Sequence, residues 1–238
     1  MRAALVTVIL AVSSVIAFPQ NTPGTTKTIF ITASAKDGKP VTLDQIECNV
    51  KLRSLEPVGT SPISYAIVLD TSNSGRDSFN AQLIAAKQIL SEVIRPNFDR
   101  GFLKTTQDEQ RVIFLLSDGE DNQSRNSFGD TVAMLVRSNI RVFPIHIGPS
   151  VAFGSRGSHG LKSIADYTGG AISELEPSRN LPDMEKVVTA IKTDLSNAYR
   201  AQLVPSPDLK KGVPYRLELR SRDRAVKLRA PTSYIVEN

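Results

Sequence analysis

The chain has 238 residues, a formal net charge of +5 and 40% hydrophobic residues, which suits one globular domain with additions or two small domains. Tryptophan is absent and aromatic residues are few, which argues against a surface that stacks on sugars or nucleobases. The single cysteine, Cys48, cannot form an internal disulfide, so the fold must depend on a packed core.

The first residues have the pattern of a secretory signal peptide. Arg2 gives a positive start, residues 3–16 are apolar, and residues 15–17 are small or apolar before a cleavage point. The apolar stretch is shorter than the ~20 residues that a spanning helix needs, and an uncleaved anchor is the alternative interpretation. We therefore expect residues 1–17 to direct the chain to the exterior or to a periplasm.

Residues 18–60 predict a linker followed by a β-rich lead-in. Residues 18–26 are polar and contain proline and glycine, whereas residues 28–33 and 46–52 have the composition of strands. This segment leads into the stretch around which the rest of the sequence is organised.

That stretch is residues 66–75, AIVLDTSNSG, in which a short apolar run ends at Asp70 and is followed by Ser72 and Ser74. An apolar run of this length, bounded by turn residues, predicts a strand buried on both faces. Residues 77–94 then have the spacing of a helix with an apolar stripe, in which Leu90 is expected to face the core.

A second stretch, residues 112–119 (VIFLLSDG), repeats the pattern and delivers Asp118 at its end. In an open α/β sheet, ligand groups collect just past the carboxyl ends of the strands. If the two strands are neighbours, Asp70 and Asp118 converge. Carboxylate and hydroxyl oxygens at such a point are hard ligands that suit Mg²⁺.

Together, the Asp70-x-Ser72-x-Ser74 motif and the later Ser117-Asp118-Gly119 motif resemble the von Willebrand factor type A domain and its metal-ion-dependent adhesion site. The fuller match is to bacterial secreted proteins that have a signal peptide, a β-rich lead-in, this domain and a β-rich tail. The resemblance implies a Rossmann-like, doubly wound, mostly parallel α/β sheet over residues 61–200.

The resemblance also implies a metal site and a kind of partner. Asp70, Ser72, Ser74 and Asp118 are the expected ligands of Mg²⁺, or of Mn²⁺ or Ca²⁺. In the family pattern the ion keeps an open position for an acidic side chain of a partner protein, so an unidentified protein ligand is expected.

The sequence departs from the family pattern between the first helix and the second motif. Only residues 95–111 lie there, where the full family fold holds a second parallel strand, an edge strand, one or two helices and a loop whose threonine joins the metal site. We do not assign that role to Thr105 or Thr106, which lack the expected glycines. The domain is therefore expected to be internally shortened and its metal site weakened.

Two structural expectations follow from this shortening. Residues 97–103 are expected to form a stump of the second strand. The strand at residues 63–69 is expected to become a sheet edge that the lead-in or a second chain covers, because a bare apolar edge invites aggregation.

The remaining sequence predicts further α/β elements and a β-rich tail. We expect helices at residues 128–139 and 161–167 and from Pro182 onwards, strands at 140–147 and 171–175, and a loop at 148–160 that contains His159. His146 is expected to be a packed core residue. In the tail, residues 201–238, two alternating stretches at 213–220 and 225–230 flank a turn and predict a β-hairpin.

The positive charge is concentrated in the tail. Residues 199–238 hold nine basic and four acidic side chains, so they carry the whole net charge. A solvated strand face is one explanation, and peripheral contact with an anionic envelope surface is another. Nucleic-acid binding is not expected, because the basic residues are not interleaved with aromatic ones.

The sequence thus predicts an exported, non-enzymatic protein-binding or adhesion module with a divalent-metal site. One alternative is a degenerate domain with a structural or interaction role, in which Asp70 and Asp118 cap the following helices and bind no metal. The other is a phosphohydrolase of the haloacid dehalogenase type with Asp70 as nucleophile. That family needs a second aspartate where this chain has Ser72.

Overall fold

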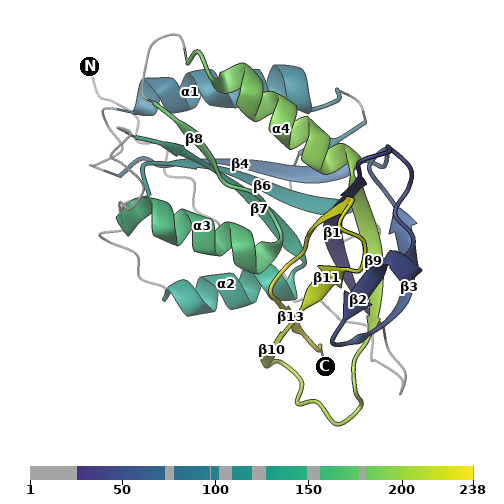
Figure 1. The fold of residues 1–238 in the computed structure, drawn as a ribbon. Helices are drawn as coiled ribbons and strands as arrows, with labels where there is room; N and C mark the ends of the chain where they lie inside the picture. Colours follow the sequence, from purple (N-terminus) through teal and green to yellow (C-terminus); the bar gives the residue numbers. More distant parts are fainter. Residues whose placement is uncertain are drawn as a thin grey trace.

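The computed structural model describes residues 26–72, 78–96, 98–101, 109–119, 127–148, 156–176 and 181–237. The predicted signal peptide at residues 1–17 and the predicted ligand Ser74 lie outside these ranges. Within them, no helix combines the length and apolar character needed to cross a membrane. The chain forms a parallel sheet covered by helices and, beside it, a group of antiparallel strands (Figure 1).

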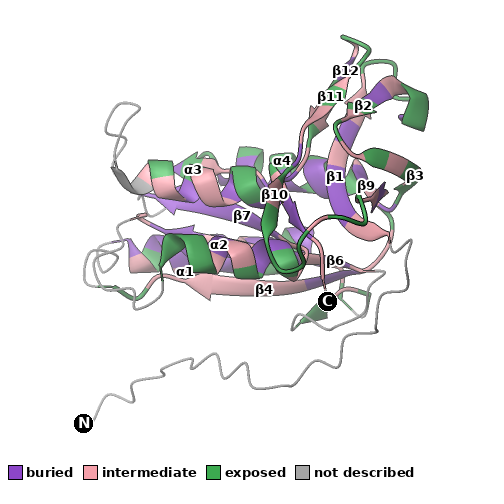
Figure 2. Cartoon of the chain, turned by 90° about the horizontal axis from the view of Figure 1, so that it is seen from below, coloured by how far each residue is buried: buried purple, intermediate pink, exposed green. Residues whose placement is uncertain are grey.

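The parallel sheet has the strand order β5-β4-β6-β7-β8, and every pairing in it is parallel. Its strands are β4 (Ile63–Leu69), β5 (Arg100–Gly101), β6 (Gln110–Ser117), β7 (Ile140–Ile147) and β8 (Ser173–Leu175). Strand β7 is buried along nearly its whole length (Figure 2), which explains its continuous apolar sequence. The predicted α/β class with a parallel sheet is confirmed.

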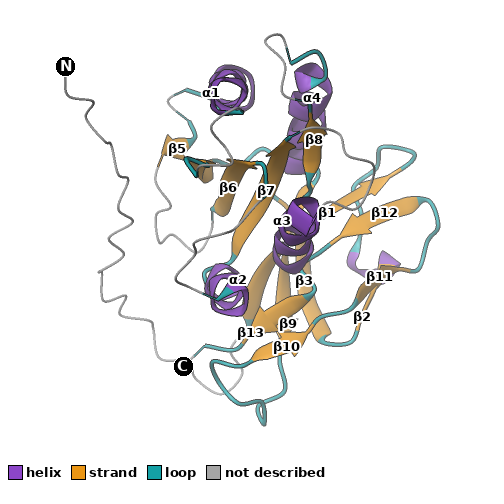
Figure 3. Ribbon diagram, turned by 90° about the vertical axis from the view of Figure 1, so that its left-hand side faces the viewer, coloured by secondary structure: helices purple, strands orange, loops and turns teal. Residues whose placement is uncertain are grey.

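Helices cover both faces of this sheet, as the doubly wound prediction requires (Figure 3). Helices α1 (Phe79–Gln88) and α4 (Met184–Ser196) lie on one face, and α2 (Phe128–Arg137) and α3 (Arg156–Thr168) lie on the other. Helix α1 continues into a π-helical turn, η3 (Ile89–Val93). The sheet is therefore enclosed between two helical layers.

Two local predictions about the helices are wrong. The buried stripe of α1 and η3 runs through Gln82, Ala85 and Ile89, so Leu90 is exposed instead of facing the core. Helix α3 begins five residues earlier than expected, at Arg156, so His159 lies in a helix and not in a loop. In both cases the spacing of apolar residues correctly predicted a helix. Tertiary packing decided which face of the first helix is buried and where the second helix begins.

Strand β4 is bounded by β6 on one side and by β5 on the other, and β5 pairs only with Ser64 and Tyr65. The predicted stump of a second strand is therefore present. The lead-in strands belong to another sheet, so the expectation that the lead-in covers this edge is wrong, and coverage by a second chain stays a prediction. Asp99 holds the stump in place, since its Oδ1 accepts hydrogen bonds from the Ile63 backbone N–H (3.0 Å) and from Arg95 Nη2 (2.7 Å).

The lead-in and the tail combine into one antiparallel unit. Its main sheet has the order β12-β1-β9-β3, formed by β12 (Val226–Arg229), β1 (Lys27–Ala35), β9 (Ala198–Val204) and β3 (Lys51–Pro57). Two short ladders join β2 (Ile46–Cys48) to β11 (Leu219–Ser221), and β10 (Pro214–Arg216) to β13 (Ser233–Ile235). The turn η1 (Leu43–Gln45) precedes β2.

The predicted C-terminal hairpin is wrong in its pairing. Strand β11 pairs with β2, and strand β12 pairs with β1, so the two tail strands do not pair with each other. The turn between them does form, since the Val226 backbone N–H donates to Asp223 O (3.0 Å). Alternating apolar residues such as Leu219, which is partly buried, identified the strands, but the partners come from the lead-in, far away in the sequence.

The parallel sheet and the antiparallel unit each have a hydrophobic core. One lies between the parallel sheet and helices α1 and α4, and includes Ile89, Phe114 and Met184. The other lies within the antiparallel unit, where Cys48 packs at its margin as a free, partly buried thiol. Helix α4 ends at Ser196 and β9 begins at Ala198, so the two cores are joined by a very short connection.

Candidate functional site

Strands β4 and β6 lie side by side and end together. Their register pairs Leu69 with Leu116, so Asp70 and Ser117 stand opposite each other and Asp118 follows one residue later. From β4 the chain passes to α1 on one face of the sheet, and from β6 it passes to α2 on the other. The two exits therefore form a topological switch point, where open α/β sheets bind ligands.

The backbone and side chain of Asp70 are both held by hydrogen bonds. Its backbone N–H donates to Leu116 O (2.9 Å) and to Gln82 Oε1 (3.0 Å). Its carboxylate accepts from the Ser72 backbone N–H at Oδ1 (2.9 Å) and from Ser117 Oγ at Oδ2 (2.6 Å). This network fixes the direction in which the carboxylate leaves the end of β4.

The end of β6 is shaped by a tight turn. Ser117 Oγ accepts a hydrogen bond from the Gly119 backbone N–H (2.9 Å), and Gly119 has φ +79°, a left-handed conformation that favours glycine. His146 pairs in register with Ser117, and its Nε2 lies 3.1 Å from Asp118 O. The buried His146 thus contacts the backbone of the site, beyond the packing role expected for it.

The predicted site residues divide into two groups. Asp70, Ser72 and Asp118 lie at the shared end of β4 and β6, whereas Ser74 is outside the described residues. Neither aspartate is the N-cap of the following helix, because α1 and α2 are preceded by Ser78 and Ser127. The capping alternative for Asp70 and Asp118 is therefore wrong.

Sequence reasoning missed two residues that shape this site. Ser117 was part of the second motif but had no assigned role, although its position directly before Asp118 was the available signal. Gln82 gave no signal, since a polar residue in an amphipathic helix is normally exposed. In the structure Gln82 is fully buried, and its Nε2 donates to Ser78 Oγ (3.0 Å).

The described residues at this site fit a hard cation. Among the described residues, each oxygen of Asp70 accepts one hydrogen bond, and a carboxylate oxygen has a second lone pair for another partner. Across the part of the chain that the structure describes, no three His, Cys, Asp or Glu side chains gather as a metal cluster. Carboxylate and hydroxyl oxygens, such as those of Asp70 and Ser117, are the ligand type that Mg²⁺ accepts.

Comparison with known proteins gave one structural likeness. No family model matches the chain, and no curated protein matches it. Among solved structures, the chain is similar to a von Willebrand factor type A protein from Catenulispora acidiphila, at 10% sequence identity and a TM-score of 0.40, over 93% of this chain and 76% of that one.

Proposed function

We propose that the shared end of β4 and β6 is a cation-assisted protein-binding site on an exported, non-enzymatic chain. The observation that carries the proposal is the placement of Asp70 beside Ser117, with Asp118 next in the chain, at the switch point of the sheet. The two sequence motifs can form one site only if the ends of their strands lie side by side, as these residues do. All three residues belong to the described part of the chain.

Charge explains how such a site would select a partner. Asp70 and Asp118 supply two negative charges, and the hydroxyls of Ser72 and Ser74 add neutral oxygen ligands. A divalent cation held in this way is roughly neutralised but lacks a full set of ligands. An acidic side chain of a partner protein would complete the shell, which makes the bound cation a bridge between the two proteins.

The residues around the ligands have a supporting role in this proposal. Ser117 and Gln82 hold Asp70 by its carboxylate and by its backbone N–H, respectively. Such supporting contacts commonly change metal affinity by about 10-fold to 100-fold when they are removed. The interval at residues 95–111 is short and lacks the family's threonine loop. We expect this loss to lower the affinity for the cation by a factor at the lower end of that range.

Calorimetric titration of the mature chain with Mg²⁺ and Mn²⁺ tests the metal site. The parent chain should give a binding heat that Asp70→Ala abolishes. Asp208→Ala is the matched control, because Asp208 is an exposed carboxylate in the antiparallel unit. Equal heats for the parent and Asp70→Ala would contradict the metal site.

A second assay separates this proposal from its rival enzymatic class. A haloacid dehalogenase-type phosphohydrolase should turn over a generic aryl phosphate in the presence of Mg²⁺, and Asp70→Ala should abolish the turnover. The binding-module proposal predicts no turnover by either protein. The expected export can be checked separately, by the position of the mature N-terminus after secretion from a bacterial host.

A further inference from the structure

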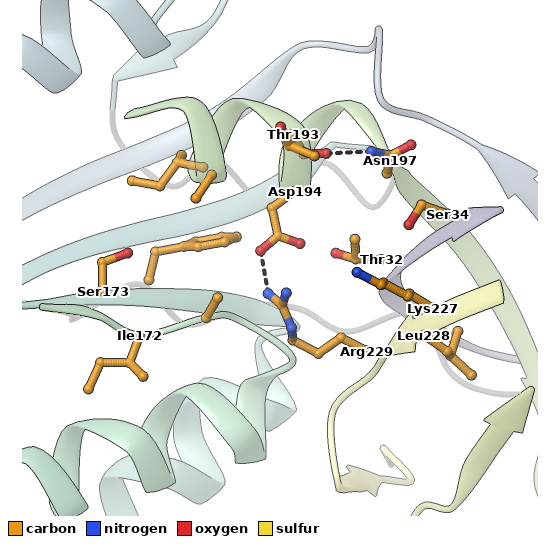
Figure 4. A pocket seen from close by; sticks show the side chains of 14 residues that line it. Thr32, Ser34, Ile172, Ser173, Thr193, Asp194, Asn197, Lys227, Leu228 and Arg229 are labelled. Atoms are coloured by element: carbon orange, nitrogen blue, oxygen red, sulfur yellow. Dashed lines mark hydrogen bonds and ion pairs between the residues drawn. The ribbon is translucent and has the colours of Figure 1, made fainter. Parts of the chain in front are cut away.

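A cleft lined by both polar and apolar side chains lies between the two cores, away from the ends of β4 and β6. It has a volume of about 630 Å³ and three walls: the end of helix α4, the segment around Phe143 and Ser173 on β7 and β8, and the face of β1 and β12 (Figure 4). A cleft of this size can hold a small molecule. It belongs to none of the motifs discussed above.

The β1–β12 wall presents an ordered set of polar side chains. Thr32 pairs in register with Arg229, and Ser34 pairs with Lys227. Because side chains two residues apart on a strand share a face, all four point to the same side of this ladder. Figure 4 shows Lys227, Arg229 and Thr32 directed toward the common space.

The facing wall is one stripe of helix α4 and its end, formed by Ala190, Thr193, Asp194 and Asn197 at helical spacing. Asp194 is 5% exposed, and its Oδ2 accepts a hydrogen bond from Arg229 Nη1. Its Oδ1 lies 3.6 Å from Arg141 Nη2 in an ion pair. Asp194 is the one carboxylate among the described lining residues, and both of its oxygens face arginines.

Arg141 is buried behind the cleft and polarises the hydroxyl of Thr32, which lines it. Its side chain is 1% exposed, and its Nη2 donates to Thr32 Oγ1 (2.6 Å). Since Thr32 Oγ1 accepts this bond, its own hydroxyl proton is left to donate elsewhere, and a charged donor behind a hydroxyl strengthens that second bond. The buried charge of Arg141 therefore makes the Thr32 hydroxyl a stronger hydrogen-bond donor toward the cleft.

The charges around the cleft do not balance. Arg141, Arg229 and Lys227 carry three positive charges, and Asp194 carries one negative charge. Among the described side chains, none forms an ion pair with Lys227. We propose that this cleft binds a small organic anion, which Lys227, Arg229 and the Thr32 hydroxyl hold while its carbon body contacts the apolar wall at Phe143 and Ile172.

The presence of two neighbouring cations, Lys227 and Arg229, favours short dicarboxylates as the class of anion. Lys227 and Arg229 are two residues apart on one strand, so their Cα atoms are separated by about 6.6 Å. A four- or five-carbon dicarboxylate has its carboxylates somewhat closer together than this, and the flexible side chains of Lys227 and Arg229 can bring one cation to each carboxylate. Inorganic phosphate would engage the cations but would leave the apolar wall without a partner.

Calorimetric titration with succinate, glutarate, butyrate and inorganic phosphate tests this proposal. Glutarate or succinate should bind with a dissociation constant on the order of 1 mM or tighter, and butyrate should bind at least about 5-fold more weakly because it lacks the second carboxylate. Binding should weaken between about 20 mM and about 500 mM sodium chloride, since salt screens exposed charges. No heat with either dicarboxylate, or tighter binding of phosphate or butyrate, would overturn the proposal.

Substitutions connect the binding to the cleft. Lys227→Gln should weaken glutarate at least about 5-fold and bring it close to butyrate, and Arg229→Gln should do the same. Lys227 is exposed and forms no ion pair with the residues that the structure describes, so its variant should melt like the parent. This keeps the test valid if Arg229→Gln unfolds. Lys211→Gln is the matched control, because Lys211 is exposed and does not line the cleft. Unchanged glutarate binding by Lys227→Gln would contradict the assignment.

Discussion

Ser117 Oγ donates a 2.6 Å hydrogen bond to Asp70 Oδ2, joining the ends of two neighbouring parallel strands. The two residues come from the two motifs that the sequence singled out, and the strand register places them opposite each other. The bond is charge-assisted, so it belongs to the stronger class of protein hydrogen bonds. It links the positions of the carboxylates on which the proposed cation site depends.

Ser117→Ala should lower the free energy of unfolding by about 1 to 3 kcal/mol, because it removes a bond to a carboxylate and leaves the Gly119 backbone N–H without its acceptor. Urea unfolding followed by circular dichroism measures the change. Ser163→Ala is the control, since the partly exposed Ser163 donates to a backbone carbonyl of its own helix, His159 O, and its effect should stay within about 0.5 kcal/mol. Equal effects of the two variants would show that the Ser117 bond adds no stability.

Gln82→Leu should destabilise the protein by about 1 to 3 kcal/mol although it adds an apolar side chain to a buried position. The amide of Gln82 bonds to the Asp70 backbone N–H and to Ser78 Oγ, and the substitution leaves Ser78 Oγ buried without this donor. Asn80→Leu on the exposed face of the same helix is the comparison for helix propensity. A Gln82→Leu variant as stable as the parent would mean that packing alone positions Asp70.

Asp99 should make stability depend on pH in the acid range. Burial by itself would raise the pKa of Asp99, but hydrogen bonds from the Arg95 side chain and from the Arg95 and Ile63 backbones outweigh it and lower the pKa. The unfolded chain then takes up the proton more readily, so this contribution is complete above the ordinary aspartate pKa of about 3.9 and is lost as the pH falls through the lower folded value.

Asp99→Asn removes that contribution. The difference in free energy of unfolding between the parent and Asp99→Asn should be largest near pH 6 and should shrink toward about pH 3. Guanidinium unfolding at several pH values measures it, with Asp166→Asn as a control on an exposed ion pair. A difference that stays constant with pH would mean that the charge of Asp99 is not what fastens the β5 stump to β4.

Two glycine substitutions should have opposite signs. A Cβ at Gly170 would lie 1.7 Å from Val142 O, so Gly170→Ala must displace backbone and should cost more than about 3 kcal/mol. Gly160 lies within α3 with no atom near its added Cβ, so Gly160→Ala should stabilise the protein by up to about 1 kcal/mol through helix propensity. Thermal melts of both variants measure the contrast. Stabilisation by Gly170→Ala would contradict the close packing of this segment on β7.

Asp194→Asn should destabilise the protein by about 3 to 5 kcal/mol, because it leaves the Arg141 guanidinium buried without its counter-charge. Burial already lowers the pKa of Arg141 to about 10. Asp183→Asn is the matched control, since Asp183 is exposed and pairs with Lys186 on the same helix, and such pairs contribute about 0 to 1 kcal/mol. Comparable losses for the two variants would show that Arg141 does not need Asp194.

The sequence by itself determined the α/β class and the core of the candidate site. Strand β7 is recognisable because a strand covered on both faces needs continuous apolar sequence. Asp70 and Asp118 are recognisable because they follow the apolar strands β4 and β6, although β4 is only partly buried and not covered on both faces as expected. The stump at β5 followed from chain length, since residues 95–111 are too few for the missing elements. These features depend on local composition and spacing, which a single sequence displays.

Only the tertiary structure decided which segments meet. It paired β12 with β1 and β11 with β2 in place of a hairpin, buried Gln82 beneath Asp70, and brought Asp194, Arg141 and Lys227 around one cleft. Strand pairing and the burial of polar groups depend on partners far away in the chain. A local pattern fixes which face of a strand is apolar, but the segment that covers this face is chosen by the free energy of the whole fold.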